Sequence, residues 1–297
     1  MNHITLERMF DDWRDDVLNG EPPRQYETGN GLEHVRLGPG TVALLGGAPG
    51  GGKTAFAMQL LLTALAADES LTACVANVEM PPERLLERQL SRLSGIPLDD
   101  IQDRRLNDDQ RAQVESAFDQ VEDIGDRLVF CKGPFTLESV AVAADTIDAE
   151  LVILDYIQRI RPAGKFEDKR GSVDATMDAI RRFADTGCCV LALSAVGRSK
   201  DIKGRTSYDG DGLSLASFRE SSELEYGADD AFMLVPSRDA ENDAVVDVTL
   251  RHLKSRYGKP TDCRMTFDRS IQRFDVEDAE GDHRGHLMTS LAQLWEA

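Results

Sequence analysis

The sequence lacks any long apolar run. No stretch of its 297 residues reaches the roughly 18 to 20 apolar residues that a membrane-spanning helix needs. The N-terminus, MNHITLERMFDDWRDD, is too acidic for a signal or transit peptide. We therefore expect a soluble, cytoplasmic protein that does not contact a membrane.

Cysteine is scarce, and no CxxC pair occurs. The five cysteines lie mostly in apolar, strand-like runs: Cys74, Cys131, Cys188, Cys189 and Cys263. Without closely spaced thiol ligands no zinc site is expected, and we interpret these cysteines as reduced core residues.

The chain also has no Pro/Ser-rich linker, no low-complexity tract and no internal repeat. We therefore expect one large domain with appendages. The expected parts are an N-terminal helix and linker over residues 1–24, the main domain over 25–275, and an acidic tail with a C-terminal helix over 276–297.

Basic residues are outnumbered, with 34 Lys and Arg against 53 Asp and Glu, which gives a formal charge of -19. This balance argues against a protein that coats nucleic acid over its whole surface. A local basic channel remains compatible with it.

Short apolar segments alternate with amphipathic ones through the middle of the chain. The expected strands are 41–47, 72–79, 127–132, 151–156 and 188–196, and the expected helices are 6–18, one from Lys53, one from Pro81 to Gly95, an insertion over 97–124, 136–150 and 173–186. This alternation indicates an α/β fold with a parallel sheet covered on both faces. From residue 230 onward strands predominate, which we interpret as an antiparallel extension of that sheet.

The stretch LLGGAPGGGKTAFAMQL, residues 44–60, fits the phosphate-loop pattern G-x-x-x-x-G-K-[ST] from Gly47 to Thr54. Glycines let main-chain N–H groups turn toward phosphate oxygens, and the following helix adds its positive N-terminal dipole. Lys53 would place a charge near the β- and γ-phosphates of ATP, while the Thr54 hydroxyl would ligate Mg²⁺. The expected nucleotide contacts are Gly47, Gly50, Gly51, Gly52, Lys53, Thr54 and Ala55. The alternative is a glycine-rich turn that binds nothing.

Two carboxylates follow predicted strands. Asp155 ends LVILDY and would hold the metal, although many strands end in Asp. Glu79 ends TACVANVE and would activate or orient the attacking water. The alternative for Glu79 is an acid at the N-terminus of the next helix, which the helix dipole favours.

A series of sequence blocks resembles the C-terminal ATPase domain of DnaB-type replicative helicases, which has a RecA-like P-loop NTPase fold. The blocks are GGAPGGGKTAFAMQL, NVEMPPERLLERQLSRLSGI, LVILDYIQRI, LALSAVGRS, SLASFRESSELEYGADDAFMLV and LKSRYGKPTDCRMTFDRSIQRFDV. The resemblance implies a ring, usually a hexamer, with ATP between subunits and single-stranded DNA in the channel. It also implies that Glu79 is the catalytic carboxylate.

The family's K-x-R-x-G segment matches Lys254, Arg256 and Gly258. The resemblance implies that this lysine and arginine enter the neighbouring subunit's nucleotide site. An arginine is suited to neutralising charge on a transferred phosphoryl group. The alternative is a hairpin with solvated basic residues.

Two loops are basic against the acidic background and would face the DNA channel. Residues 159–170 hold five basic and two acidic residues, and residues 198–205 hold four basic and one acidic. The block FRESSE resembles the family's strand-binding segment. The candidate DNA contacts are Arg159, Arg161, Lys165, Lys200, Lys203, Arg205, Arg219, Glu220 and Ser222. Solvated loops are the alternative.

The sequence departs from the family pattern in three ways. Ala195 stands where the family usually has Gln, and an alanine side chain cannot hydrogen-bond to a phosphate. Only about 40 residues precede the first strand, so the family's primase-contacting N-terminal domain is not expected. The pI of about 4.7 weakens general affinity for nucleic acid.

These observations support two hypotheses. The first is an ATP-driven ring helicase or translocase on single-stranded DNA, acting with replication, repair or mobile-element proteins. The second is a nucleotide-gated DNA-binding or regulatory assembly that does not unwind. Phe10 and Trp13, in the helix expected over residues 6–18, would dock on a neighbouring subunit or on their own domain.

Overall fold

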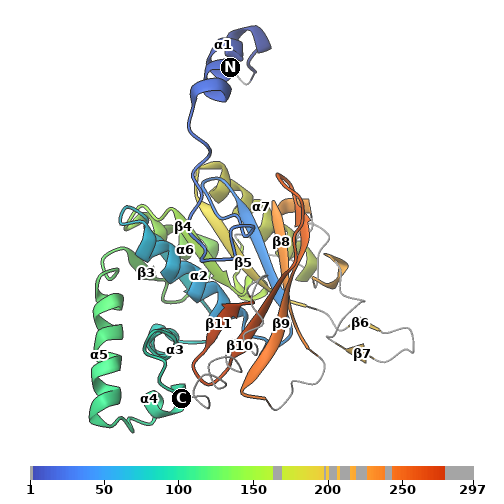
Figure 1. Ribbon diagram of the computed structural model, residues 1–297. Helices are drawn as coiled ribbons and strands as arrows, with labels where there is room; N and C mark the ends of the chain where they lie inside the picture. The colour runs from blue at the N-terminus through green and yellow to red at the C-terminus, as the bar shows by residue number, and fades with distance from the viewer. Residues whose placement is uncertain are drawn as a thin grey trace, which may run out of the picture.

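A nine-stranded sheet crosses the centre of the computed structural model (Figure 1). The structure describes residues 3–162, 169–196, 199–200, 206–207, 215–218, 226–237 and 243–277. The strand order is β11-β10-β9-β8-β1-β5-β4-β2-β3. The strands are β1 Val42–Gly47, β2 Ala73–Asn77, β3 Leu128–Phe130, β4 Leu151–Asp155, β5 Cys189–Ala195, β8 Asp230–Pro236, β9 Val245–Ser255, β10 Cys263–Asp268 and β11 Arg273–Val276. A separate pair joins β6 Ser199–Lys200 to β7 Thr206–Ser207.

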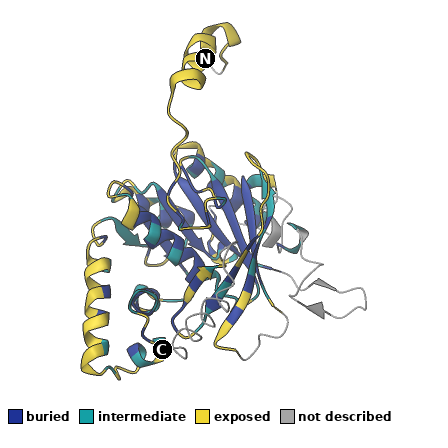
Figure 2. Cartoon of the chain, in the orientation of Figure 1, coloured by how far each residue is buried: buried dark blue, intermediate teal, exposed yellow. Residues whose placement is uncertain are grey.

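Helices cover both faces of this sheet. They are α1 Leu6–Asn19, α2 Lys53–Ala67, α3 Pro82–Ser94, α4 Leu98–Gln102, α5 Asp108–Glu122, α6 Leu137–Asp145 and α7 Lys169–Asp185, with 3-10 turns η1 Ile157–Arg159 and η3 Leu215–Ser217. One apolar cluster packs α2 on one face, and a second packs α6 and α7 on the other. A third, smaller cluster joins α3, α4 and α5. The central strands β1, β4 and β5 are buried except for Ala195 at the end of β5 (Figure 2), as a sheet covered on both faces requires.

The expected antiparallel extension begins one strand later than predicted. β8 runs parallel to β1, with Ala43 paired to Asp230, and the antiparallel pairing starts between β8 and β9. Burial explains the difference. β8 is buried along almost its whole length, like the parallel strands β1, β2, β4 and β5, whereas β9 alternates between exposed and buried residues. The apolar run in 230–236 therefore belongs to the parallel part of the sheet.

The predicted connector between the first helix and the first strand also forms part of the core. It has no helix or strand, as expected, yet Tyr26, Leu32, Val35 and Leu37 are buried in the cluster that contains α2. All five cysteines are buried and free, as predicted.

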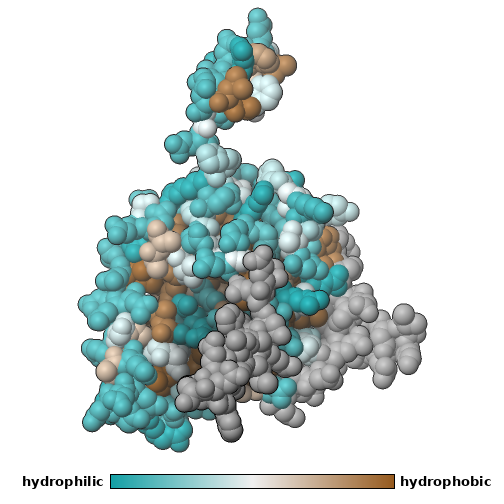
Figure 3. Space-filling model, viewed as in Figure 1, coloured by the Kyte–Doolittle hydropathy of each residue, from teal (hydrophilic) through white to brown (hydrophobic). Residues whose placement is uncertain are grey.

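The amphipathic helix α1 projects away from the rest of the chain (Figure 1). Every residue from 3 to 25 is exposed, and apolar side chains gather on one side of the projecting helix (Figure 3). Among them, Phe10 and Trp13 make an edge-to-face contact, with ring centroids 5.9 Å apart. The structure therefore does not place this helix against its own domain. Among the described residues, no helix is both long enough and apolar enough to span a bilayer.

Candidate nucleotide site and family

The predicted phosphate loop joins the end of β1 to the start of α2. Gly47 is the last residue of β1, and Lys53, Thr54 and Ala55 begin α2. Gly50 and Gly52 have φ angles of 73° and 83°, a left-handed conformation that favours glycine. The fold therefore brings the predicted nucleotide contacts together as one turn at a helix N-terminus.

Lys53 is held inside this turn. Its Nζ donates hydrogen bonds to Gly47 O and Ala48 O, both at 2.9 Å. Burial lowers the pKa of Lys53, while the nearby Asp155 and Glu79 carboxylates oppose that shift. A phosphate at the loop would give this buried cation a stronger acceptor than the two carbonyl groups.

Asp155, at the end of β4, is hydrogen-bonded to Thr54 in the first turn of α2. Its Oδ2 accepts hydrogen bonds from Thr54 Oγ1 at 2.7 Å and from Asn77 Nδ2 at 2.5 Å. Burial raises the pKa of Asp155, and Glu79 raises it further, whereas Thr54 and Lys53 act in the opposite direction. A hydroxyl and a carboxylate in contact are the hard oxygen donors that Mg²⁺ prefers. These residues therefore fit a magnesium ion.

Glu79 lies two residues beyond the end of β2. The Asn77 side chain fixes this segment, because its Oδ1 accepts from Glu79 N at 2.9 Å and from Met80 N at 2.7 Å. The following helix α3 begins at Pro82 and carries Glu83 in its first turn. Glu79 thus lies just before that helix, and its charge influences both Lys53 and Asp155.

Sequence reasoning did not single out Asn77 or Gln158, which connect the strand ends of this site. Gln158 Nε2 donates to Ser194 Oγ at 2.8 Å and to Ala195 O at 3.3 Å, while its Oε1 accepts from Ala195 N at 3.2 Å. The turn after β4 is thereby tied to the end of β5, where Ala195 contributes only its main chain. The bonds of Asn77 to Glu79 N and Met80 N are local and typical of an Asn side chain in a turn, whereas its bond to Asp155 and those of Gln158 to Ser194 and Ala195 join residues distant in the sequence, which no spacing rule signals.

Lys254 and Arg256 lie at the opposite end of the parallel strands from the phosphate loop. Ser255 pairs with Asp230 at the start of β8, whereas Gly47, beside the phosphate loop, pairs with Leu234 further along it. At roughly 3.3 Å per residue, the four steps between Asp230 and Leu234 span about 13 Å. Within one chain these basic residues therefore do not line the phosphate loop.

Two predicted DNA contacts border a hollow at the carboxyl-terminal edge. Arg159 and Arg161 line a cavity of about 250 Å³ together with Val78, Pro134, Phe135 and Thr136. Val78 is next to Glu79, so this cavity borders the segment that carries Glu79. Lys200 is described by its backbone only. Lys165, Lys203, Arg205, Arg219, Glu220 and Ser222, like the expected C-terminal helix, lie outside the described residues.

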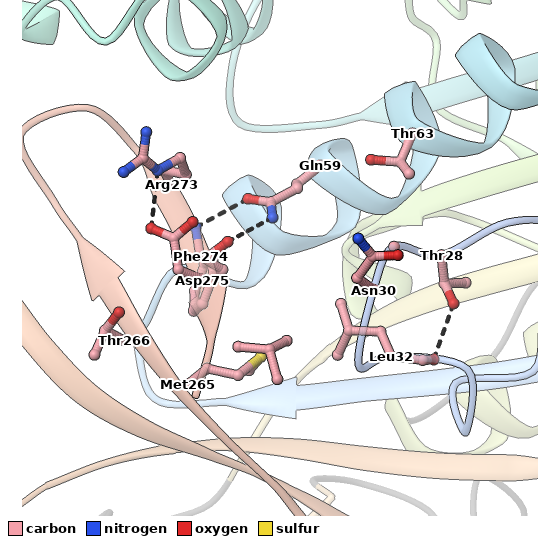
Figure 4. Close-up of a pocket in the computed structure, with 12 residues that line it drawn as sticks. Thr28, Asn30, Leu32, Gln59, Thr63, Met265, Thr266, Arg273, Phe274 and Asp275 are labelled. Atoms are coloured by element: carbon pink, nitrogen blue, oxygen red, sulfur yellow. Dashed lines mark hydrogen bonds and ion pairs between the residues drawn. The ribbon is translucent and has the colours of Figure 1, made fainter. Parts of the chain in front are cut away.

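A larger hollow, of about 550 Å³, lies between the segment 28–32, α2 and the strands β10 and β11 (Figure 4). Beside it, Gln59 Nε2 donates to Phe274 O at 2.7 Å, and Gln59 Oε1 accepts from Phe274 N at 2.9 Å. No residue of the phosphate loop lines this hollow. The two Gln59 hydrogen bonds beside it attach β11 to α2.

Most of the chain matches one known protein family. Residues 32–276 match the family described as DnaB-like helicase C terminal domain. The chain belongs to this family. Replicative DNA helicase DnaB of Helicobacter pylori is 24% identical over 197 residues, which is 64% of this chain and 38% of that protein. DnaB of Haemophilus influenzae is 24% identical over 252 residues, which is 80% of this chain and 52% of that protein. A probable plasmid replicative DNA helicase of Chlamydia psittaci is 22% identical over 66% of this chain and 43% of its own length. The chain thus spans about half or less of these relatives.

Solved structures show the same fold. The ATPase domain of G40P superposes with a TM-score of 0.76 at 17% identity, covering 93% of this chain and 100% of that one. A DnaB-like replicative helicase, described with its interactions with primase, gives a TM-score of 0.74 at 17% identity and covers 92% of this chain and 67% of that one. A KaiC-like protein from Pyrococcus horikoshii gives 0.58 at 16% identity, covering 86% of this chain and 100% of that one. The expected RecA-like fold is confirmed, and the chain is a DnaB-like ATPase domain.

Proposed function

We propose that this protein hydrolyses ATP with Mg²⁺ in a ring of identical subunits. The ring binds single-stranded DNA in its channel and acts on it as a helicase or translocase. The observation that carries this proposal is that the chemical groups lie at opposite ends of the strands of one sheet. The phosphate loop, Asp155 and Glu79 occupy one end, and Arg256 and Lys254 occupy the other. A second copy of the chain would complete the site.

At the phosphate-loop end of the strands, each residue has a distinct task. The loop amides and Lys53 bind the β- and γ-phosphates, which sets the attacked phosphorus in place. Thr54 and Asp155 would hold Mg²⁺, which when bound supplies positive charge beside the phosphates. Glu79, placed by Asn77, accepts the proton of the attacking water.

The neighbouring subunit supplies Arg256, with Lys254 beside it, to neutralise charge on the transferred phosphoryl group. Such an arginine accelerates hydrolysis by about 10³- to 10⁵-fold. The exposed stripe of α1, including Phe10 and Trp13, docks on that neighbour and holds the ring together. The hexamer is the ring that the family implies.

Single-stranded DNA runs past the carboxyl-terminal edge in this proposal. Arg159 and Arg161, which border the cavity near Glu79, contact the phosphate backbone without reading sequence. The remaining predicted contacts are Lys165, Lys200, Lys203, Arg205, Arg219, Glu220 and Ser222. The relatives are named as replicative helicases, which favours a replication system of a cell or a mobile element.

A second candidate function is a nucleotide-gated assembly that binds DNA without unwinding it. Ala195 favours this candidate, because its side chain cannot bond to a phosphate and its main chain is already paired with Gln158. Strand-displacement assays with and without ATP separate the two. DNA-stimulated hydrolysis without displacement supports the second candidate.

Mixed rings test whether the site is shared between subunits. Glu79→Gln subunits lack the base but carry Arg256, whereas Arg256→Ala subunits have the base but lack the arginine. Each variant alone should lose hydrolysis about 10³-fold or more, and a mixture should recover activity at interfaces that combine the intact halves. Mixing either variant with the Glu79→Gln, Arg256→Ala double variant is the control. If mixed rings form, as shown by their mass, but recover nothing beyond this control, the shared site is wrong.

A further inference from the structure

We infer that Asp229 is a positioning residue that orients Arg256 for the neighbouring subunit's nucleotide. This inference rests on the proposed function. Asp229 immediately precedes β8, and its side chain is only 1% exposed. Its Oδ1 accepts a hydrogen bond from Arg256 Nη1 at 2.6 Å, and its Oδ2 accepts one from Arg181 Nη1 at 2.7 Å.

The position of this carboxylate is itself fixed by the sheet. Asp229 Oδ2 also accepts from Val42 N at 2.9 Å, and Asp229 N donates to Val42 O at 2.7 Å. Arg256 N donates to Asp229 O at 2.9 Å, so the two residues are joined through main chain and side chain. A carboxylate buried among two guanidinium groups and an N–H group has its charge and its acceptor positions satisfied. Asp229 is therefore a rigid point of attachment.

The Arg256 guanidinium keeps donors available for a second anion. An arginine side chain has five N–H groups. In the part of the chain that the structure describes, Nη1 bonds Asp229 and Nη2 bonds Tyr226 O at 3.3 Å, while the side chain remains 39% exposed. The remaining N–H groups can meet phosphate oxygens without breaking the contact with Asp229. Since the guanidinium is already ordered, less conformational entropy is lost when the neighbour's phosphate arrives.

Lys254 is attached to the same short segment. Its Nζ donates to Ala228 O at 2.7 Å and to Tyr226 O at 3.3 Å. The segment 226–229 thus holds both basic residues that the proposed function assigns to the neighbour. Asp229 is its one charged side chain, which is why removal of that charge should affect Arg256 most.

The test is a double-mutant cycle on turnover in the full chain. Asp229→Asn keeps the size of the side chain but removes its charge. We expect it to lower kcat for DNA-stimulated ATP hydrolysis by about 10- to 100-fold, because small misplacements of a catalytic group have effects of this size. The KM for ATP and the affinity for a fluorescent ATP analogue should change by less than about threefold, since the phosphate loop is untouched. In the Arg256→Ala background, Asp229→Asn should have no further effect on kcat.

Arg181→Ala is the matched control. It removes the other ion pair of the same carboxylate and disturbs the same buried cluster, but it leaves Arg256 attached. Its kcat should stay within about threefold of the wild type. If Asp229→Asn fails to fold, Asp229→Glu keeps the charge and displaces the carboxylate, and it should still lower kcat.

Three results would overturn the inference. The first is an unchanged kcat in a folded Asp229 variant. The second is a raised kcat, which would mean that Asp229 restrains Arg256. The third is an equal loss of kcat with and without Arg256, which would indicate a purely structural effect. Failure of the proposed function looks different, because Arg256→Ala itself would then leave turnover unchanged.

Discussion

A Cβ atom on Gly52 would lie 2.7 Å from Cζ of Phe274, so the phosphate loop packs directly on the last strand of the sheet. The Phe274 ring stacks on Phe267, with ring centroids 4.2 Å apart and planes 11° apart, and Phe267 Cε1 would lie 3.1 Å from the same Cβ atom. Gly52 also has a φ of 83°, which disfavours other residues. Loop shape thus depends on a residue more than 200 positions away.

Gly52→Ala should therefore be more harmful than Gly50→Ala. Both positions are left-handed, so each alanine carries strain of about 1–2 kcal/mol. Only Gly52→Ala also overpacks, because nothing lies within 4 Å of a Cβ on Gly50. We expect an additional loss of about 1–3 kcal/mol in urea unfolding, with weaker ATP binding. Phe274→Leu should restore part of this loss. Equal losses for the two alanine variants would contradict the packing argument.

Asn77→Ala should lower kcat with little change in ATP affinity. It removes the acceptor for Glu79 N and Met80 N and the donor to Asp155. Leaving such groups unpaired costs about 1–3 kcal/mol, and Glu79 loses its support. Steady-state hydrolysis and equilibrium ATP binding measure the two effects. Turnover equal to that of the wild type would show that Asn77 does not place Glu79.

Asp155→Asn should raise the thermal stability of the nucleotide-free protein at pH 7 while abolishing turnover. Burial raises the pKa of Asp155 in the folded state. The folded protein therefore holds this proton more tightly than the unfolded chain, whose Asp pKa is about 3.9, and Asp155 ionisation reduces stability as pH rises. Asparagine has no charge to bury, so its advantage should be largest at pH 7 and shrink toward acid pH. Thermal melts from about pH 4, near the pKa of an unfolded Asp side chain, up to pH 8 measure this trend. Asp119→Asn, on exposed α5, should leave Tm unchanged, and a lower Tm for Asp155→Asn would contradict the desolvation argument.

Removing residues 1–20 should leave the unfolding temperature of the domain unchanged but reduce its assembly. No residue of α1 is buried in its own chain, so its loss exposes no core. Trp13→Ala should weaken the ring by about 2 kcal/mol or more if this side chain anchors the contact, whereas the exposed Asp12→Ala should not. The mass of each variant in solution, at protein concentrations close to the one at which the ring dissociates, measures these effects on assembly. An unchanged oligomer after truncation would exclude α1 as the subunit contact.

Arg161→Ala should weaken single-strand binding equally across sequences. Loss of one phosphate contact lowers the slope of log affinity against log salt by about 0.7. Arg111→Ala, on the exposed side of α5, removes the same charge outside the cavity that Arg159 and Arg161 line and serves as the control. Binding titrations over a range of salt concentrations separate the two. Equal slopes for the wild type and Arg161→Ala would remove this residue from the interface.

The strand and helix pattern was readable because buried parallel strands are continuous apolar runs. The strand 151–155 is such a run. The helix from Lys53 is a longer, mostly apolar segment that directly follows the glycine-rich turn. The direction of β8 was not readable in the same way. Its apolar run suits any buried strand, and only its pairing with Ala43 and its neighbours in β1 makes it parallel.

By itself, the sequence determined the phosphate-loop pattern, because Gly47 to Thr54 hold the glycines, the lysine and the hydroxyl within one contiguous segment. The tertiary structure alone decided what surrounds it. Asn77 reaches Asp155 across 78 positions, Gln158 reaches Ala195 across 37, and Asp229 holds Arg256 at the opposite end of the parallel strands. These contacts depend on strand order and side-chain packing between distant segments, which no local pattern encodes.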